Sequence, residues 1–93
     1  IRHGKVKNVY SIGDAEAEVI EAQVMSTSPI AGSRIGEIDF PEGVIVGGIL
    51  KNGEMVKPSS QSKIEEGDII AVFVLSKDIP EVERLLQVTI DYF

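Results

Sequence analysis

The dipeptide Asn52-Gly53 limits how this chain can fold more than any other feature, because it stands between two apolar runs. Asn and Gly tolerate the positive φ angles of a two-residue type I′ turn, so the pattern predicts a β-hairpin whose first strand is Val44–Leu50. The register that follows joins one pair of opposite charges and two apolar pairs: Lys51 with Glu54, Leu50 with Met55, and Ile49 with Val56.

Further strands follow from the pattern on both sides of the hairpin. Ile69–Leu75 is apolar without interruption, which predicts a central strand buried on both faces. Ala15–Met25 is compatible with a helix or a strand, and a strand over Glu18–Met25 is favoured. Lys5–Ile12 favours a short extended segment that precedes a Gly13-Asp14 turn. Gly47-Gly48 predicts a bulge or a close backbone approach inside the hairpin strand.

Two short helices are expected. Ser33 is a suitable N-cap for the first helix, in which Ile35 and Ile38 share one face, and Pro41 ends it. For the second helix, Asp78 is the expected N-cap, Pro80 lies in the first turn, and Glu81 is expected to complete a capping box. The apolar stripe of this helix consists of Ile79, Val82, Leu85 and Leu86.

These elements predict an α+β fold, with a small mixed or antiparallel β-sheet and two short helices. Ile1–Gly4 has the pattern of a helix end with a glycine cap, and we expect the chain to be a piece of a longer protein. Val88–Phe93 alternates, as an edge strand or a partner-pairing strand does. The predicted core residues are Ile35, Ile38, Val46, Ile49, Ile64, Ile70, Val72, Val82 and Leu85.

Composition excludes several classes of function. The formal net charge of the 93 residues is −6, whereas a nucleic-acid surface needs clustered Lys and Arg, so no nucleic-acid partner is expected. The chain has no Cys, which removes disulfides, thiolate nucleophiles and Cys-based metal sites. No apolar run approaches the ~20 residues of a membrane helix.

The residues also give little sign of catalysis or of a metal site. His3 is the single histidine and stands at the start of the chain, where we expect it to be exposed. The neighbouring carboxylates Glu65-Glu66 and Glu16/Glu18 are expected to be solvated. The glycines fit neither a GxGxxG motif nor a P-loop. We therefore expect no enzyme activity and no bound metal.

One weak signal for anion binding remains. Gly32-Ser33-Arg34 offers backbone N–H groups, a hydroxyl and a guanidinium at a predicted helix start, and Lys57 and Ser59 are candidates to lie near it. A capped helix with an exposed arginine explains the same residues without a ligand.

Four segments carry a family resemblance in their order along the chain: Ile30–Ile38, Gly43–Ile49, Ile64–Asp68 with the apolar strand that follows, and Val82–Gln87. Together they resemble the C-terminal regulatory domain, called TrkA-C or RCK-C, of the Trk-type potassium-uptake regulators. The resemblance implies a TrkA-C regulatory domain over residues 15–93. Residues 1–14 would then be a lead-in segment from a preceding nucleotide-binding domain.

The resemblance also implies partners and a place in the cell. Members of this family dimerise and act as cytoplasmic gating domains, here peripheral to the inner membrane through an integral-membrane Trk-type potassium transporter subunit. The nucleotide-binding half, which this chain does not contain, would take NAD(H) or an adenine nucleotide. No cofactor is expected in this domain.

Some relatives bind cyclic di-AMP at the dimer interface, which makes a small anionic or nucleotide ligand an expectation for this family. Carried over to this chain, the ligand-binding candidates are Arg34, Ile35, Ile45, Lys57 and Pro58. The chain departs from the family pattern, since Ile45 stands where an Asn is found and Phe40-Pro41-Glu42 where an Arg is found. Dimerisation and signal transmission are therefore favoured over second-messenger binding.

Two alternatives stay open. The same domain also suits a different membrane ion or solute transporter. Ile64–Phe73 also looks like the end of a ubiquitin-like or TGS-type interaction module. The sulfur-carrier chemistry of such modules needs a Gly-Gly terminus, and this chain ends in Asp91-Tyr92-Phe93.

Overall fold

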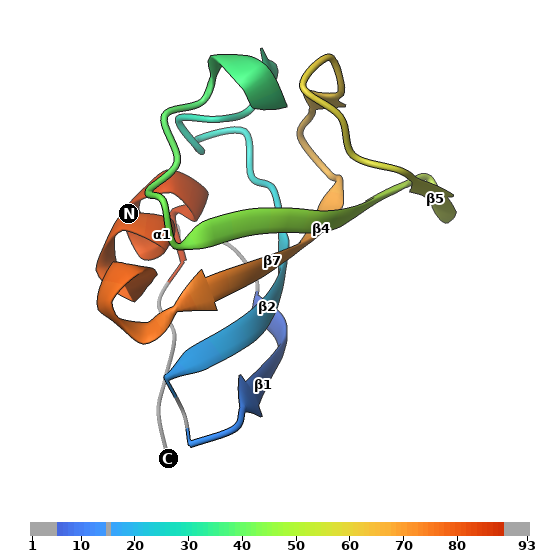
Figure 1. Cartoon of the computed structure of the whole chain (residues 1–93). Coiled ribbons are helices and arrows are strands. Elements are labelled where there is room, and N and C mark those ends of the chain that lie inside the picture. The colour runs from blue at the N-terminus through green and yellow to red at the C-terminus, as the bar shows by residue number, and fades with distance from the viewer. Residues whose placement is uncertain (1–5, 15, 89–93) are drawn as a thin grey trace.

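The computed structural model describes residues 6–14 and 16–88. In this part of the chain a five-stranded antiparallel sheet carries helix α1 on one side (Figure 1). The strand order is β1-β2-β7-β4-β5, and a two-stranded sheet of β3 and β6 lies at one end. The strands are β1 Val6–Ile12, β2 Ala17–Gln23, β3 Ser33–Arg34, β4 Val44–Lys51, β5 Glu54–Val56, β6 Lys63–Ile64 and β7 Ile69–Leu75.

The predicted α+β class is confirmed, with fewer helices than expected. In the described residues, one α-helix, α1, covers Ile79–Leu86, and two 3-10 turns, η1 and η2, cover Ile35–Glu37 and Ser76–Asp78. The segment Ala17–Gln23 is a strand, as favoured, because alternate side chains on it are buried.

The predicted hairpin is confirmed in turn and register. Asn52 and Gly53 have φ angles of 50° and 82°, the positive values that a type I′ turn needs. The ladder between β4 and β5 contains the three predicted pairs, with Lys51 opposite Glu54 at its end. The register of β4 against β7 shifts between Val46 and Gly48, which places a bulge at the glycine pair.

The first predicted helix is a single 3-10 turn. Ser33 pairs with Ile64 in the two-stranded sheet, so it lies in a strand and does not cap a helix. The second helix begins at Ile79 as predicted, but Asp78 makes no capping hydrogen bond with its side chain. The prediction of a capping box is also wrong, because the Glu81 carboxylate instead accepts two hydrogen bonds from the Arg84 guanidinium, at 2.7 and 2.6 Å.

The core lies between the sheet and α1. Six of the predicted core residues are buried, and three others, Ile35, Ile38 and Val46, are partly buried and pack against them. The structure adds eight buried residues that the prediction left out. The buried apolar residues of the described part of the chain are Ile20, Ala22, Val24, Ile30, Ile49, Ile64, Ile70, Val72, Val74, Ile79, Val82, Leu85, Leu86 and Val88.

Strand β7 is central, but it is not buried on both faces as predicted. Ile70, Val72 and Val74 point into the core, whereas Phe73 and Leu75 are 43% and 41% exposed. No described element covers this second side of the sheet, so an apolar run here does not imply two buried faces.

Strand β1 pairs with β2 although it lies within the predicted lead-in segment. The assignment of residues 1–14 to a preceding domain, and of 15–93 to the regulatory domain, stays a prediction. The expectations for His3, for a helix end at Ile1–Gly4 and for an edge strand beyond Val88 concern residues 1–5 and 89–93, which lie outside the described residues.

Candidate functional site

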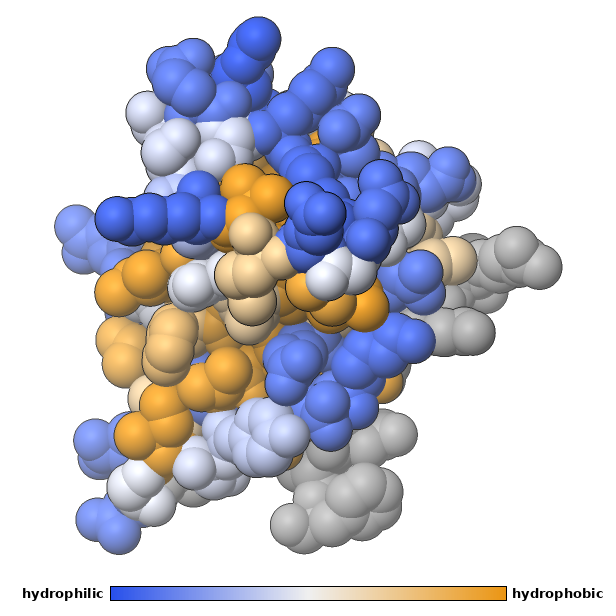
Figure 2. All heavy atoms as spheres, turned by 90° about the vertical axis from the view of Figure 1, so that its right-hand side faces the viewer, coloured by the Kyte–Doolittle hydropathy of each residue, from blue (hydrophilic) through white to orange (hydrophobic). Residues whose placement is uncertain are grey.

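The side of the sheet that faces away from the core is strongly apolar, and we call it the outer face. Cross-strand pairs build it from neighbouring strands: Tyr10 lies opposite Val19, Val19 opposite Phe73, and Phe73 opposite Ile45. Figure 2 shows apolar side chains gathered in a band flanked by hydrophilic residues. The large exposed apolar side chains of the outer face are Tyr10, Ile12, Ile45, Met55, Phe73 and Leu75.

A hollow of about 260 Å³ opens at one end of the outer face, where β4 begins and β7 ends. Its lining comes from four strands and the loop before β4, and Glu42 is its single charged residue. The lining residues are Ile12, Ala17, Glu42, Gly43, Ile45, Phe73, Val74 and Leu75. Such a lining favours an apolar group inside the hollow, and the Glu42 carboxylate favours a cation at its rim.

The glycine pair of the bulge allows two large side chains to lie on the backbone of β4. A Cβ on Gly47 would lie 2.5 Å from Cε2 of Phe73, and one on Gly48 would lie 3.2 Å from Sδ of Met55. Phe73 and Met55 therefore lie over backbone that carries no side chain. The outer face is flat in its middle as a result, which suits packing against another flat apolar surface.

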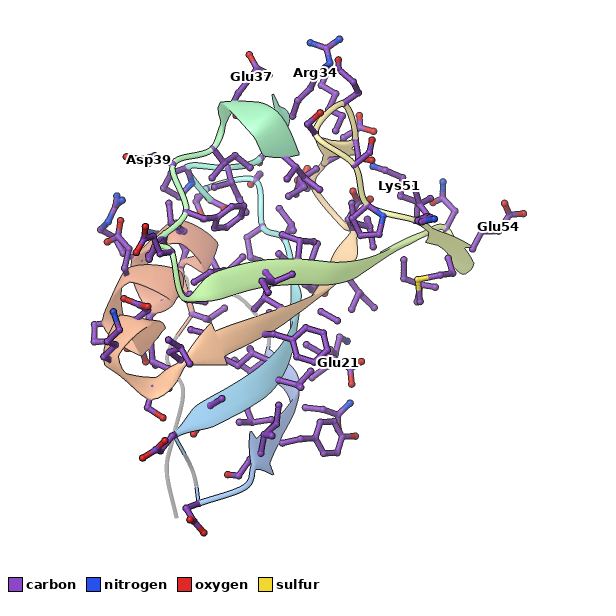
Figure 3. All side chains as sticks on the ribbon, viewed as in Figure 1. Glu21, Arg34, Glu37, Asp39, Lys51 and Glu54 are labelled. Atoms are coloured by element: carbon purple, nitrogen blue, oxygen red, sulfur yellow. The ribbon has the colours of Figure 1, made fainter. Side chains whose placement is uncertain are left out.

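An ion cluster fixes the hairpin end of the sheet. The Lys51 ammonium lies 2.5 Å from Oδ2 of Asp68 and 3.1 Å from Oε1 of Glu65. Burial acts to lower the pKa of Lys51, but hydrogen bonds and charges from Asp68 and Glu65 outweigh it, so the pKa is raised above its ordinary value. Asp68 is buried and also accepts a hydrogen bond from the Glu65 backbone N–H. Figure 3 shows Lys51 and Glu54 at this end.

Four of the five predicted ligand-binding residues lie in or near the two-stranded sheet. The backbone N–H groups of Ile35 and Gly36 donate to the carbonyls of Ser62 and Ser60, at 2.9 and 2.8 Å. These bonds hold the segment with Arg34 beside the loop that follows Lys57 and Pro58. Figure 3 shows Arg34 and Glu37 at this end of the molecule, with their nearest nitrogen and oxygen 4.0 Å apart.

The fifth candidate lies elsewhere. Ile45 is 65% exposed on the outer face, opposite Phe73, and lines the hollow. The structure thus places Ile45 apart from the cationic candidates Arg34 and Lys57. Their roles in ligand binding stay predictions.

Among residues 6–14 and 16–88, two carboxylates have a buried oxygen without a hydrogen bond: Oε2 of Glu18 and Oδ2 of Asp78. Glu18 is only 3% exposed, so the expectation that it is solvated was wrong, because the core-facing side of β2 includes this position. Oδ2 of Asp78 lies so close to Gly43 that a Cβ there would overlap it.

The described residues contain no group of three or more His, Asp or Glu side chains that could hold a metal ion. Within the same ranges, no helix is long and apolar enough to cross a membrane. The arrangement that stands out is a binding surface, the outer face with its hollow.

Sequence reasoning missed this surface. Ile69–Leu75 lacks the apolar–polar alternation that marks a solvated face, and it therefore looked buried on both sides. The one available signal was Gly47-Gly48, which was interpreted as a close backbone approach, and the side chains of Phe73 and Met55 are what approach it.

Comparison with known proteins gives a consistent result. The model of the TrkA-C domain family matches residues 19–87. The chain is 33% identical over its full length to the Trk system potassium uptake protein TrkA of Azorhizobium caulinodans. It is 38% identical over 94% of its length to the protein of the same name from Haemophilus influenzae. In both cases it spans 20% of the relative, about a fifth of its length.

Two solved structures share the fold. A crystal structure of the GsuK RCK domain has a TM-score of 0.75 and 18% identity, covering 96% of this chain and 20% of that one. A structure of an RCK domain "with cda" has a TM-score of 0.63 and 19% identity, covering 73% of this chain and 96% of that one. The family match extends over most of the described sheet and α1, and the chain belongs to the TrkA-C domain family.

Proposed function

We propose that this chain is the regulatory, dimer-forming, ligand-sensing domain of a Trk potassium uptake system. In that role it gates an integral-membrane potassium transporter from the cytoplasmic side of the inner membrane. The observation that carries the proposal is the similarity of the entire chain to potassium uptake proteins named TrkA.

The outer face supports the dimer-forming part of the proposal. Exposed apolar side chains from β1, β4, β5 and β7 form one continuous surface that no described part of the chain covers. Soluble monomers rarely expose large contiguous apolar patches, and such patches commonly mark protein–protein contacts. A second protein surface is therefore the expected cover.

Gating would follow from a shift between dimer geometries. A ligand or a transporter subunit that binds one geometry more tightly shifts the population toward it. The nucleotide-binding half implied by the family resemblance would take NAD(H) or an adenine nucleotide. This domain is proposed to need no cofactor and no catalytic group.

Ligand sensing is tested by thermal shift with cyclic di-AMP, ATP, NAD(H) and inorganic phosphate as probes. A probe at ~100 times its Kd stabilises the fold by about 2.7 kcal/mol, which is an easily measured change. Arg34→Ala should abolish the shift, whereas Arg84→Ala should keep it. The two arginines are a matched pair, because their side chains are 57% and 58% exposed. No shift with any probe would remove ligand sensing from the proposal.

The potassium function is tested in cells that depend on Trk uptake. The matching segment of the Haemophilus influenzae relative is replaced by this chain, and uptake is measured at low external potassium. The chimaera should restore uptake that a version lacking the segment does not. A chimaera that accumulates normally without restoring uptake would contradict the proposal and favour a different membrane transporter.

A further inference from the structure

Met55 and the hollow lie at opposite ends of the outer face. Met55 follows the hairpin turn and is 71% exposed, the largest exposed fraction among the large apolar side chains of the described residues. The hollow lies at the other end of β4, beside Ile45. Strand β4 runs from the loop with Glu42 and Gly43, which lines the hollow, to the hairpin turn that precedes β5 (Figure 1).

The two features match in chemistry. An enclosed apolar cavity of about 150 Å³ already holds a benzene molecule, so a hollow of about 260 Å³ has room for a methionine side chain. A thioether is flexible and packs well against aromatic rings, and Phe73 supplies a ring in the lining. Met55 does not line the hollow of its own chain, and its sulfur lies over Gly48 in the middle of β4.

Two-fold symmetry brings the ends together. Two copies can pack their outer faces together about a two-fold axis that lies in the plane of the interface and runs perpendicular to the strands. In that arrangement the hairpin end of each copy meets the hollow end of the other. Such an interface is isologous, so each contact occurs twice. Two sheets packed face to face in this way keep their strands roughly aligned.

Charge favours the same arrangement. Glu42 lies at the rim of the hollow, whereas Lys57 follows β5 at the hairpin end and is exposed. Neither residue belongs to an ion pair among the described residues. Exchanging the ends places the free cation of each copy near the free carboxylate of the other. A face with one sign of charge at both ends would repel its own copy.

We propose that the outer face docks on the outer face of a second copy about this two-fold axis, with Met55 of each copy seated in the hollow of the other. The proposal rests on the dimer of the proposed function and assigns the surface and the register of that dimer.

The absence of Cys in the sequence allows a direct test by disulfide cross-linking. Two single variants, Ile45→Cys and Met55→Cys, are tagged differently, mixed and oxidised. Both positions are more than half exposed, so the fold should persist, and thermal melting checks that it does. A disulfide needs Cα atoms roughly 4.4–6.8 Å apart, so only residues in contact link efficiently.

The mixed disulfide should form faster than either homodisulfide. Glu54→Cys replaces Met55→Cys as the matched control, because Glu54 precedes Met55 and by register lies on the other face of the hairpin. It should give no enriched mixed product. Enrichment of the Met55→Cys homodisulfide, or equal yields from the two hairpin variants, would overturn the proposed register.

Sedimentation separates this inference from the dimer itself. Met55→Glu should raise the dimer dissociation constant about tenfold or more, whereas Ser60→Glu in an exposed loop should not. A Met55→Glu dimer of unchanged affinity would overturn the inference and leave the proposed dimer standing. A wild-type chain that stays monomeric at high concentration would overturn both, and the potassium uptake assay would then show whether the regulatory function survives.

Discussion

The ring of Phe73 lies on the backbone of Gly47, with only 2.5 Å between Cε2 and the place where a Cβ would stand. Gly47→Ala should therefore push the ring off β4. The cost should be about 1 kcal/mol of unfolding free energy, because a half-exposed ring can move to another rotamer. Urea unfolding measures the loss. Phe73→Leu is the control background, in which Gly47→Ala should cost less. An equal cost in both backgrounds would contradict a contact between the two residues.

Ser28 ties the loop after β2 to the end of α1. Its hydroxyl donates a 2.6 Å hydrogen bond to the Leu85 carbonyl, and the residue is buried. Ser28→Ala should lower the free energy of unfolding by about 1–3 kcal/mol, because it leaves a buried carbonyl without this partner. Thermal unfolding reports the change. Thr27→Ala, at an exposed neighbouring position, should have little effect, and equal losses from both variants would contradict the role given to Ser28.

The local elements of this fold were predictable where turn chemistry and alternation act within a few residues. Asn52-Gly53 specified both the hairpin and its register, since positive φ angles are needed at that one place. The start of α1 was also predicted from a local signal, Asp78, although the side chain of this residue makes no capping hydrogen bond. The first helix failed because Ser33 pairs with Ile64, a partner 31 positions along the chain that no local pattern reveals.

The candidate site was less predictable, because exposure depends on what covers a strand. Phe73 and Val72 are both apolar neighbours in β7, yet one is 43% exposed and the other is buried. Glu18 shows the opposite error, since a carboxylate was expected in solvent and lies in the core. In each case the residue type was known from the sequence, whereas the part of the molecule that covers the residue was not.

Glu18 offers a test of what that burial costs. Its Oε2 is buried without a hydrogen bond, and an unpaired polar group in a core is destabilising. Glu18→Met keeps much of the volume and should raise the free energy of unfolding by about 1–3 kcal/mol in urea titrations at neutral pH. Glu21→Met, on the outer face of the same strand (Figure 3), should change it by less than about 0.5 kcal/mol. A clear loss of stability in Glu18→Met would show that the carboxylate has a favourable role.

Lys51 should stabilise the hairpin end through its two carboxylate partners. Lys51→Met removes the ammonium that binds the buried Asp68 carboxylate, which then keeps the hydrogen bond from the Glu65 backbone N–H. The substitution should lower the free energy of unfolding by about 1–3 kcal/mol at pH 7. Lys63→Met, at an exposed position in β6, is the matched control and should cost much less. Urea unfolding at pH 7 compares the two variants.

The pH dependence of that difference follows from the raised pKa of Lys51. The unfolded chain binds the Lys51 proton with an ordinary pKa of about 10.4, and the folded chain holds it more tightly. The stabilisation is therefore fully present below about pH 10.4 and is lost as the pH rises through the higher folded value. The gap between the wild type and Lys51→Met should stay constant from about pH 7 to 9 and shrink above about 10.4. A gap that already shrinks near pH 8, or that widens in alkali, would mean that Lys51 does not act as the charged centre of this cluster.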